Sequence, residues 1–225
     1  MVARSAAGFR RQTRLQRRQL YRNGNYRRGR GASGGRCDSW TGGFFALEDN
    51  KGLIAQRKDD GHVRVSALFR MAENDFASLG ISFTDPAATR AAILAQFQDW
   101  SLEIKGLINV CDESFFARPI TALPVGIRWA SQQRVTLVGD AAHQMSPFAG
   151  AGANLAMQDG AEFALELLKL QEPPVAIAAY EKKMFERAKV AAQRSAEGLE
   201  MCISPHGATL FAKRMAQYQA LRREA

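Results

Sequence analysis

The stretch that most restricts the fold is VTLVGDAAHQMSPFAGAGANLAMQDGAEFALELL, residues 135–168. A continuous apolar run at 135–138 predicts a strand covered on both faces, and the residues from 152 onward predict a helix that is apolar almost all round. The loop between them lies where a strand ends and a helix begins, a position that ligands favour in α/β folds. The stretch therefore predicts an α/β arrangement with a ligand site in this loop.

Small residues fill the loop and restrict what it can hold. They remove side-chain bulk along the backbone, so a flat or extended ligand can approach closely, and Pro147 stiffens the path of the chain. The N–H groups of Gly152, Ala153 and Asn154 have no partner inside the helix and present partial positive charge. Asp140 offers a carboxylate, which suits sugar-like hydroxyls better than phosphate. A ligand with a polyol at one end and an electron-accepting ring at the other satisfies both groups.

The residues before this motif predict a sheet with a covering helix. Short segments rich in Phe, Val, Ile and Leu alternate with Asp-Asn-Lys-Gly and Asp-Asp-Gly turns, as in an antiparallel meander. Asp85 as a cap and Pro86 in the first turn begin a helix that is expected to cover the sheet. Its apolar stripe consists of Ile93, Leu94, Phe97 and Trp100. The strands are expected at residues 42–48, 52–57, 62–70 and 113–123.

Composition limits the class of protein and the compartment in which we expect it. With 225 residues, of which 46% are hydrophobic, the chain can bury a sizeable core. No run approaches the roughly 18 to 20 apolar residues of a membrane span, and two arginines follow Phe9 where a secretory signal would be apolar. Cys37, Cys111 and Cys202 are far apart and form no CxxC pair, so neither a disulfide framework nor a zinc site is indicated. We expect a soluble, cytoplasmic protein.

The net charge of +9 comes from the first residues of the chain. Residues 1–37 hold 11 of the 31 basic residues and none of the 22 acidic ones, and they have no sustained period. This composition predicts a disordered basic arm. Three interpretations stay open for it: binding of RNA or an anionic surface, a mitochondrial-type leader, or no function of its own. Nucleic-acid binding is not favoured, because the remaining residues are close to neutral.

Two motifs within the arm lack their usual context. Gly29, Gly31 and Gly34 spell G-x-G-x-x-G, which needs a hydrophobic strand before it. Residues 21–28, YRNGNYRR, are not expected to form that strand. Residues 31–35 match G-x-S-x-G, whose serine requires a strand-to-helix turn and distant acid and histidine partners. Neither match is expected to be functional.

The segment GDAAHQMSPFAGAGANLAMQD, residues 139–159, resembles the second flavin-binding motif of the group A aromatic-hydroxylase flavin monooxygenases, and most of all that of the tetracycline-inactivating enzymes. The resemblance continues through residues 80–100, 103–108, 117–124 and 180–188. It implies a mixed α/β chain that forms the carboxyl-terminal part of a Rossmann-like FAD/NAD(P)-binding fold, with a substrate-domain sheet. The expected parts are the arm at 1–38, the sheet and its covering helix at 39–123, the flavin-motif region at 124–170 and carboxyl-terminal helices at 171–225.

The resemblance also implies roles for single residues. Asp140 would bind the ribityl hydroxyls of FAD, and Gly139 would let the chain pass close to the ribityl phosphate. The segment from Pro147 would line the isoalloxazine, whose electron-rich edge would face the first N–H groups of the helix. The full expected set is Gly139, Asp140, Pro147, Phe148, Ala149, Gly150, Ala151, Gly152, Ala153 and Asn154. No catalytic residue and no metal ligand is assigned.

Two polar residues of the motif are expected to have structural roles. His143 and Asp140 could form a metal pair, but two ligands without a third favour a structural histidine that bonds the loop. Asp159 lies in a nearly all-apolar helix, where its carboxylate is expected to bond backbone groups of the preceding loop.

The implied function is NAD(P)H-dependent, FAD-dependent hydroxylation of an aromatic or polycyclic small molecule by oxygen. The amino-terminal G-x-G-x-x-G turn of the family and its later Asp-Gly motif have no counterpart here in their proper context. We therefore expect a truncated form that binds flavin poorly, does not turn over, and associates with itself through an exposed sheet. The alternative is a non-catalytic fragment that binds nucleic acid through the arm or binds a partner chain that supplies the nucleotide-binding unit.

Overall fold

The computed structural model describes residues 19–26, 43–58, 62–71, 78–170 and 172–223. These residues form a mixed α/β structure of two compact units, which confirms the predicted class. One unit is built from residues 121–200. The other consists of the described residues between 19 and 120 together with 201–223. The predictions for residues 1–18, for the two glycine motifs and for Cys37 lie outside the described residues.

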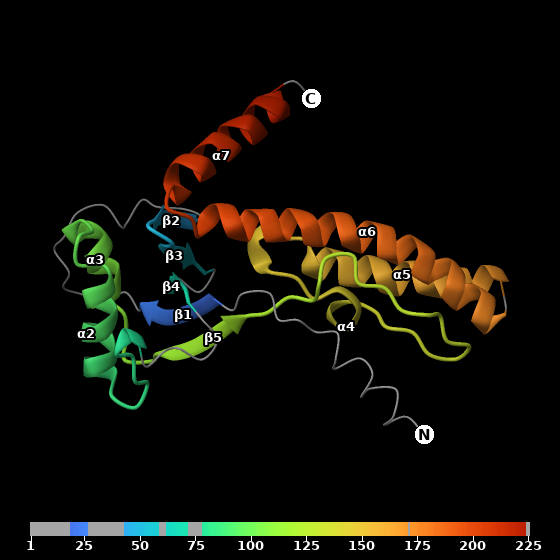
Figure 1. Cartoon of the computed structure of the whole chain (residues 1–225), viewed down its shortest axis with the longest axis horizontal. Coiled ribbons are helices and arrows are strands. Elements are labelled where there is room, and N and C mark those ends of the chain that lie inside the picture. The colour runs from blue at the N-terminus through green and yellow to red at the C-terminus, as the bar shows by residue number, and fades with distance from the viewer. Residues whose placement is uncertain (1–18, 27–42, 59–61, 72–77, 171, 224–225) are drawn as a thin grey trace. The chain divides into compact units, whose positions relative to one another are not determined.

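The second unit is organised around a five-stranded antiparallel sheet in the order β2-β3-β4-β1-β5 (Figure 1). Asp49 and Asn50 connect β2 to β3 with φ values of 52° and 60°, a left-handed pair that a two-residue hairpin turn requires. The predicted strands are confirmed with small changes in their ends, and the predicted strand at 113–123 is shorter than expected. The strands are β1 (Gln19–Tyr26), β2 (Gly43–Glu48), β3 (Lys51–Arg57), β4 (Val63–Arg70) and β5 (Phe116–Ile120).

The strand β1 corrects the sequence analysis. The predicted disordered arm is wrong for Gln19–Tyr26, which pair with β4 on one side and with β5 on the other. Low aliphatic content led to the wrong prediction, but pairing on both sides gives the backbone of β1 its hydrogen bonds whatever its side chains are. Both pairings are antiparallel, so β1 does not supply the parallel β-α-β context that a G-x-G-x-x-G turn requires.

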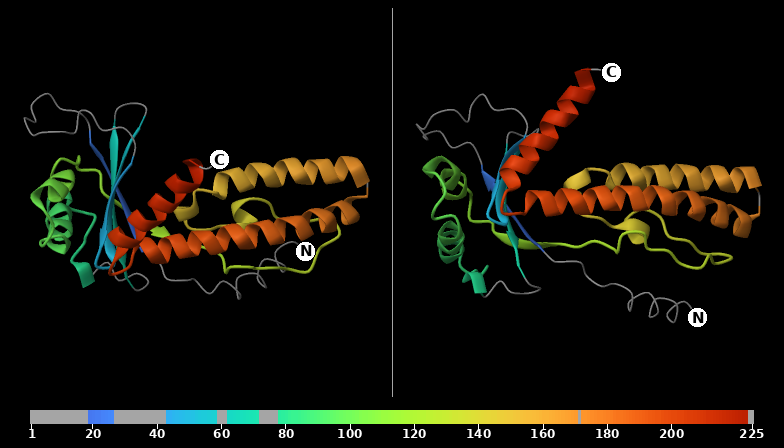
Figure 2. Two further views of the ribbon diagram at one scale, coloured as in Figure 1. Left: turned by 90° about the horizontal axis from the view of Figure 1, so that it is seen from above. Right: turned by 45° about the horizontal axis from the view of Figure 1, so that its top comes forward.

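Two helices cover one face of this sheet, α2 (Pro86–Gln96) and α3 (Leu102–Asn109) (Figure 2). The predicted cap of α2 is confirmed, because Asp85 accepts hydrogen bonds from the N–H groups of Ala87 and Ala88 at 2.9 and 3.2 Å. The predicted stripe is also confirmed: Ile93 and Phe97 are fully buried against the sheet, and Leu94 and Trp100 are partly buried there.

The carboxyl-terminal helix α7 (Gly207–Arg223) contacts β2 of the same unit. Phe211 stacks on Phe45 with ring centroids 4.8 Å apart. Gly207 is required at the start of this helix, because a Cβ there would lie 2.6 Å from the carbonyl oxygen of Cys202 and 3.0 Å from the Cβ of Leu47. Most of the remaining helix is exposed, including Leu210, Met215, Tyr218 and Leu221.

The unit of residues 121–200 contains α5 (Gly152–Leu170) and all but the last two residues of α6 (Pro173–Cys202). The two helices form a long antiparallel pair and lie side by side in all three views (Figures 1 and 2). The predicted start of α5 near residue 152 is confirmed. The prediction of a strand at 135–138 is wrong for the described structure, because no described strand pairs with this segment. A strand needs a neighbouring backbone for its hydrogen bonds. Side chains of α6 hold the segment instead, and Val135 and Val138 remain 64% and 43% exposed.

None of the helices among the described residues combines the length and the apolar content that a membrane crossing needs.

We predict that truncation of Phe97 destabilises the sheet unit strongly. Its ring is fully buried and lies 5.5 Å from the ring of Phe69 and 4.9 Å from that of Trp100. Phe97→Ala should lower the free energy of unfolding by about 3–5 kcal/mol, through lost transfer energy and the cavity left behind. The measurement is urea unfolding followed by circular dichroism. Leu102→Ala, at a residue that is 80% exposed, is the control and should change stability little.

Candidate flavin-binding site

The loop that precedes α5 is shaped by two glycines with positive φ. Gly139 has φ 60° and ψ −140°, and a Cβ there would lie 3.1 Å from the Cβ of Ala156 on α5. Gly150 has φ 63° and closes the turn Pro147–Ala149, with open space where its Cβ would be. Between them lies the single turn α4 (Asp140–His143). The backbone of the loop is therefore packed against α5 at Gly139 and accessible at Gly150.

The fully buried carboxylate of Asp159 on α5 fixes the start of this loop. One of its oxygens accepts the backbone N–H of Gly139 at 2.8 Å and lies 2.7 Å from Nε2 of His143. The other oxygen accepts a hydrogen bond from Arg187 of α6 at 2.8 Å. The prediction for Asp159 is confirmed, because its carboxylate bonds the loop backbone. His143 has a structural contact, but the contact joins the loop to Asp159 on α5 and is not made to another group of the loop. No group of metal-binding residues occurs in the described part of the chain.

The electrostatics of this cluster favour the charged carboxylate. Burial alone would raise the pKa of Asp159, but the hydrogen bonds from Gly139, Arg187 and His143 outweigh it and hold the pKa below its usual value of 3.8. Arg187 also binds Glu162 of α5 at 2.7 Å. The cluster therefore joins the loop, α5 and α6 through one ionised group that is paired on both oxygens.

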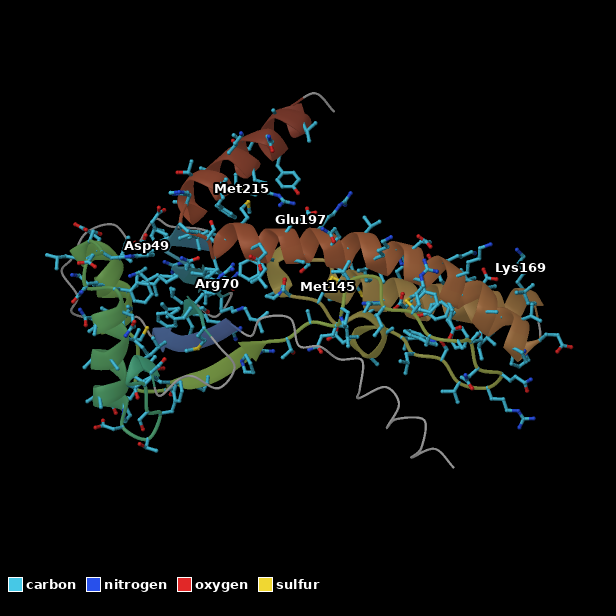
Figure 3. All side chains as sticks on the ribbon, viewed as in Figure 1. Asp49, Arg70, Met145, Lys169, Glu197 and Met215 are labelled. Atoms are coloured by element: carbon cyan, nitrogen blue, oxygen red, sulfur yellow. The ribbon has the colours of Figure 1, made fainter. Side chains whose placement is uncertain are left out.

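A second set of contacts fixes the middle of the loop on α6. The hydroxyls of the buried Ser146 and Ser195 lie 2.7 Å apart, and Ser146 also donates to the carbonyl of Ser195 at 3.0 Å. Three residues further along α6, a Cβ at Gly198 would lie 3.2 Å from the carbonyl oxygen of Phe148. Figure 3 shows Met145 and Glu197 near this end of the helix pair and Lys169 near the opposite end. The turn that begins at Pro147 is thus held directly against the helix backbone.

The extended segment before the loop is also bound to α6. The buried carboxylate of Glu181 accepts hydrogen bonds from Trp129 at 2.8 Å and from Thr136 at 2.7 Å. The hydroxyl of Tyr180 donates to the carbonyl of Leu137 at 3.2 Å. Burial, above all, raises the pKa of Tyr180, so this hydroxyl keeps its proton. These contacts set the direction from which the chain reaches Gly139.

The residues expected to bind FAD come together in this loop, and most of them are exposed. Asp140 points its carboxylate toward the first turn of α5, 3.9 Å from where a Cβ of Gly152 would lie. Phe148, Ala151 and Gly152 are half-buried. Pro147, Ala149, Gly150, Ala153 and Asn154 are exposed, and Gly139 is buried. An accessible backbone, an exposed carboxylate and a helix amino terminus fit an extended ligand with hydroxyls and an electron-rich ring.

Several residues that position the loop were not found from the sequence, namely Glu181, Arg187, Ser195 and Gly198. All four lie on α6, whose residues are far from the motif in the sequence but adjacent in the fold. Gly198 offers the clearest missed signal, because a glycine inside a helix costs about 1 kcal/mol relative to alanine and usually has a packing reason.

Comparison with known proteins shows which proteins this chain resembles. Residues 124–195 match the family described as the FAD binding domain. Monooxygenase asqM of Emericella nidulans is 31% identical, over 78% of this chain and 51% of that protein. The dual O-methyltransferase/FAD-dependent monooxygenase CTB3 of Cercospora beticola is 37% identical, over 65% of this chain and 16% of that protein. The chain thus spans about half the length of asqM.

Solved structures agree on the fold. HpxO of Klebsiella pneumoniae, complexed with FAD and uric acid, superposes with a TM-score of 0.63 and 20% identity over 93% of this chain and 50% of HpxO. The tetracycline destructase Tet(51) gives a TM-score of 0.60 and 18% identity over 91% of this chain and 52% of that one. The chain is thus similar in sequence to FAD-dependent monooxygenases and corresponds to a carboxyl-terminal portion of them.

We predict that loss of the Asp159 charge destabilises the unit of residues 121–200. Asp159→Asn should lower the free energy of unfolding by about 3–5 kcal/mol, because Arg187 and the Gly139 N–H lose a buried charged acceptor. Glu162→Gln is the matched control: it has the same partner, Arg187, but its side chain is 26% exposed. It should cost about 1 kcal/mol or less. Equal losses in the two variants, measured by urea unfolding, would contradict the central position given to Asp159.

Stability should also fall in acid through the same group. The pKa of Asp159 is lower in the folded chain than its usual 3.8, so its stabilising effect is complete well above that value. The effect is lost as the pH falls below the usual value and through the folded pKa. Urea unfolding from about pH 7 down to about pH 3 should show a steeper acid decline for the unmodified chain than for Asp159→Asn. Parallel declines would exclude Asp159 as a source of acid sensitivity.

Proposed function

We propose that this chain forms the part of an FAD-dependent monooxygenase that holds the isoalloxazine and ribityl portions of the cofactor. The observation that carries this proposal is the loop 139–154, in which an exposed carboxylate lies beside the amino terminus of a 19-residue helix. The family match over 124–195 covers the same residues.

Each expected residue has a defined task in this proposal. Asp140 accepts hydrogen bonds from the ribityl hydroxyls, and Gly139 leaves room for the chain beside them. Pro147, Phe148, Ala149 and Gly150 form the surface under the ring, with Ala151 completing the turn. The N–H groups of Gly152, Ala153 and Asn154 face the electron-rich edge of the ring, where partial positive charge stabilises a reduced, anionic cofactor. FAD supplies the redox chemistry when bound.

The reaction proposed for the whole protein is hydroxylation of an aromatic or polycyclic small molecule by oxygen, with NAD(P)H as reductant. Two kinds of support exist. Several relatives are named as monooxygenases, and structures with this fold hold FAD together with a small molecule, uric acid in HpxO and a substrate in CtdE. The role of residues 121–200 in this reaction is to bind and orient the cofactor and to place positive potential at its ring.

We predict that Asp140→Ala weakens flavin binding by the unmodified chain about ten- to a hundredfold, the equivalent of one hydrogen bond to a charged acceptor. Titration calorimetry with riboflavin measures this directly, because riboflavin contains the ring and the ribityl chain without the ADP group. Glu172→Ala removes another exposed carboxylate, near the opposite end of α5, and should leave the affinity unchanged.

Two results would contradict the assignment. Equal riboflavin affinity of the unmodified chain and Asp140→Ala would remove Asp140 from the site. Failure of the full chain to bind riboflavin or FAD, even at millimolar concentration, would contradict the cofactor role of the loop. FAD should bind little more tightly than riboflavin, because the proposed residues contact only the portion that the two ligands share.

We also propose that apolar side chains exposed in the 135–138 segment and along α5 drive self-association of this chain. Val135 and Val138 belong to an extended segment that pairs with no strand in the described part of the chain, and α5 exposes Met157, Leu165 and Leu168 by 67%, 63% and 75%. Unpaired backbone and exposed apolar side chains favour association.

Light scattering coupled to size-exclusion chromatography tests this association. The unmodified chain should elute as oligomers, and Leu165→Glu combined with Leu168→Glu should shift it toward the monomer. Leu102→Glu, at an exposed leucine of the other unit, is the control and should not change the elution. A monomeric unmodified chain would contradict this proposal and leave the flavin proposal intact.

A further inference from the structure

A small cavity lies beside the flavin loop, within the unit of residues 121–200. Its volume is about 10 Å³, which is close to the space that one buried water molecule needs. The cavity lies between the 123–127 segment, α4 and α6. Its apolar lining includes Leu123, Pro124, Ile127, Ala142, Met184 and Ala188.

The polar residues that line the cavity are His143, Gln144 and Lys189. The His143 side chain is only 2% exposed, and its Nε2 faces Asp159 at 2.7 Å. Its other nitrogen, Nδ1, is buried and has no hydrogen-bond partner among the described residues. A buried polar atom without a partner is costly, and native proteins commonly satisfy such atoms with an ordered water.

The partners of Asp159 decide which proton His143 carries. The carboxylate already accepts the Gly139 N–H and the Arg187 guanidinium, and its pKa is held low, so it can only accept. Nε2 of His143 must therefore be the nitrogen that carries hydrogen. When the ring is neutral, Nδ1 is then an acceptor, and this buried atom needs a hydrogen-bond donor.

We propose that this cavity binds one water molecule, which donates a hydrogen bond to Nδ1 of His143 and fixes the ring tautomer that bonds Asp159. His143 is then a positioning residue for the loop: the water orients the imidazole, the imidazole and Gly139 share one oxygen of Asp159, and Gly139 precedes Asp140. Only the expected effect of this positioning on flavin binding at Asp140 rests on the proposed function. The water site and the tautomer are measured without flavin.

Lys189 is the competing donor. It also lines the cavity, and its side-chain carbons lie 3.6 Å from where a Cβ of Gly126 would be. Its stem therefore covers the Gly126 side of the cavity, while the residue as a whole is exposed. A charged amine prefers water to an apolar cavity, because transfer of the charge from solvent is costly. The proposal accordingly assigns the donor role to water.

Nitrogen NMR of the full chain labelled at histidine tests the tautomer, because the sequence contains only three histidines, His62, His143 and His206. His143→Gln assigns the signals by deletion. We expect hydrogen on Nε2 and none on Nδ1 of His143, together with a long-lived water cross-peak to its ring. His206 is 80% exposed and should show no such water. Hydrogen on Nδ1, or the absence of a water contact, would overturn the proposal.

Two substitutions and one control variant separate the possible donors. Ala188→Val fills space in the cavity and should abolish the water contact and lower the urea midpoint. Ala178→Val, at an exposed position of the same helix, carries the same helix-propensity cost and should keep the water contact. Lys189→Met should keep both the water contact and the tautomer. If Lys189→Met no longer carries hydrogen on Nε2 alone of His143, the donor is the lysine. If the water contact persists in Ala188→Val, the water lies elsewhere. Either result overturns the proposal.

Discussion

The buried carboxylate of Asp159 is the group on which the geometry of the flavin loop depends. A charge without exposure to solvent is tolerated only when donors replace its lost hydration. Three donors do so here, and they come from Gly139, from α4 through His143 and from α6 through Arg187. Since each donor lies on a different element, satisfying one carboxylate fixes the relative positions of the loop and both long helices.

This arrangement gives the loop an inner side that packs on the helices and an outer side that is exposed. Gly139, Ser146 and Phe148 make the inward contacts of the loop with α5 and α6, whereas Asp140, Ala149 and Gly150 are exposed. Partial positive charge at the first turn of α5 and negative charge at Asp140 lie close together but suit different parts of one ligand. A rigid inner side and an accessible outer side are what a pre-organised cofactor site requires.

The local predictions from sequence were the successful ones. The turn at Asp49 and Asn50, the cap at Asp85 and the start of α5 each depend on residues that lie within a few positions of one another. The failures concern pairing between distant segments. The strand at Gln19–Tyr26 was missed because its partners, β4 and β5, come much later in the chain. The strand predicted at 135–138 has no described partner, so its apolar run does not make it a strand.

The sequence by itself determined the loop chemistry: small residues, one carboxylate and a helix that begins at Gly152, all consequences of short-range steric and hydrogen-bonding preferences. It also indicated that Asp159 would bond the loop. Only the tertiary structure decided which residues hold that loop in place. Four residues of α6 hold the loop because this helix packs against α5 and the loop: Glu181, Arg187, Ser195 and Gly198. The packing of two helices brings together residues that no local sequence pattern connects.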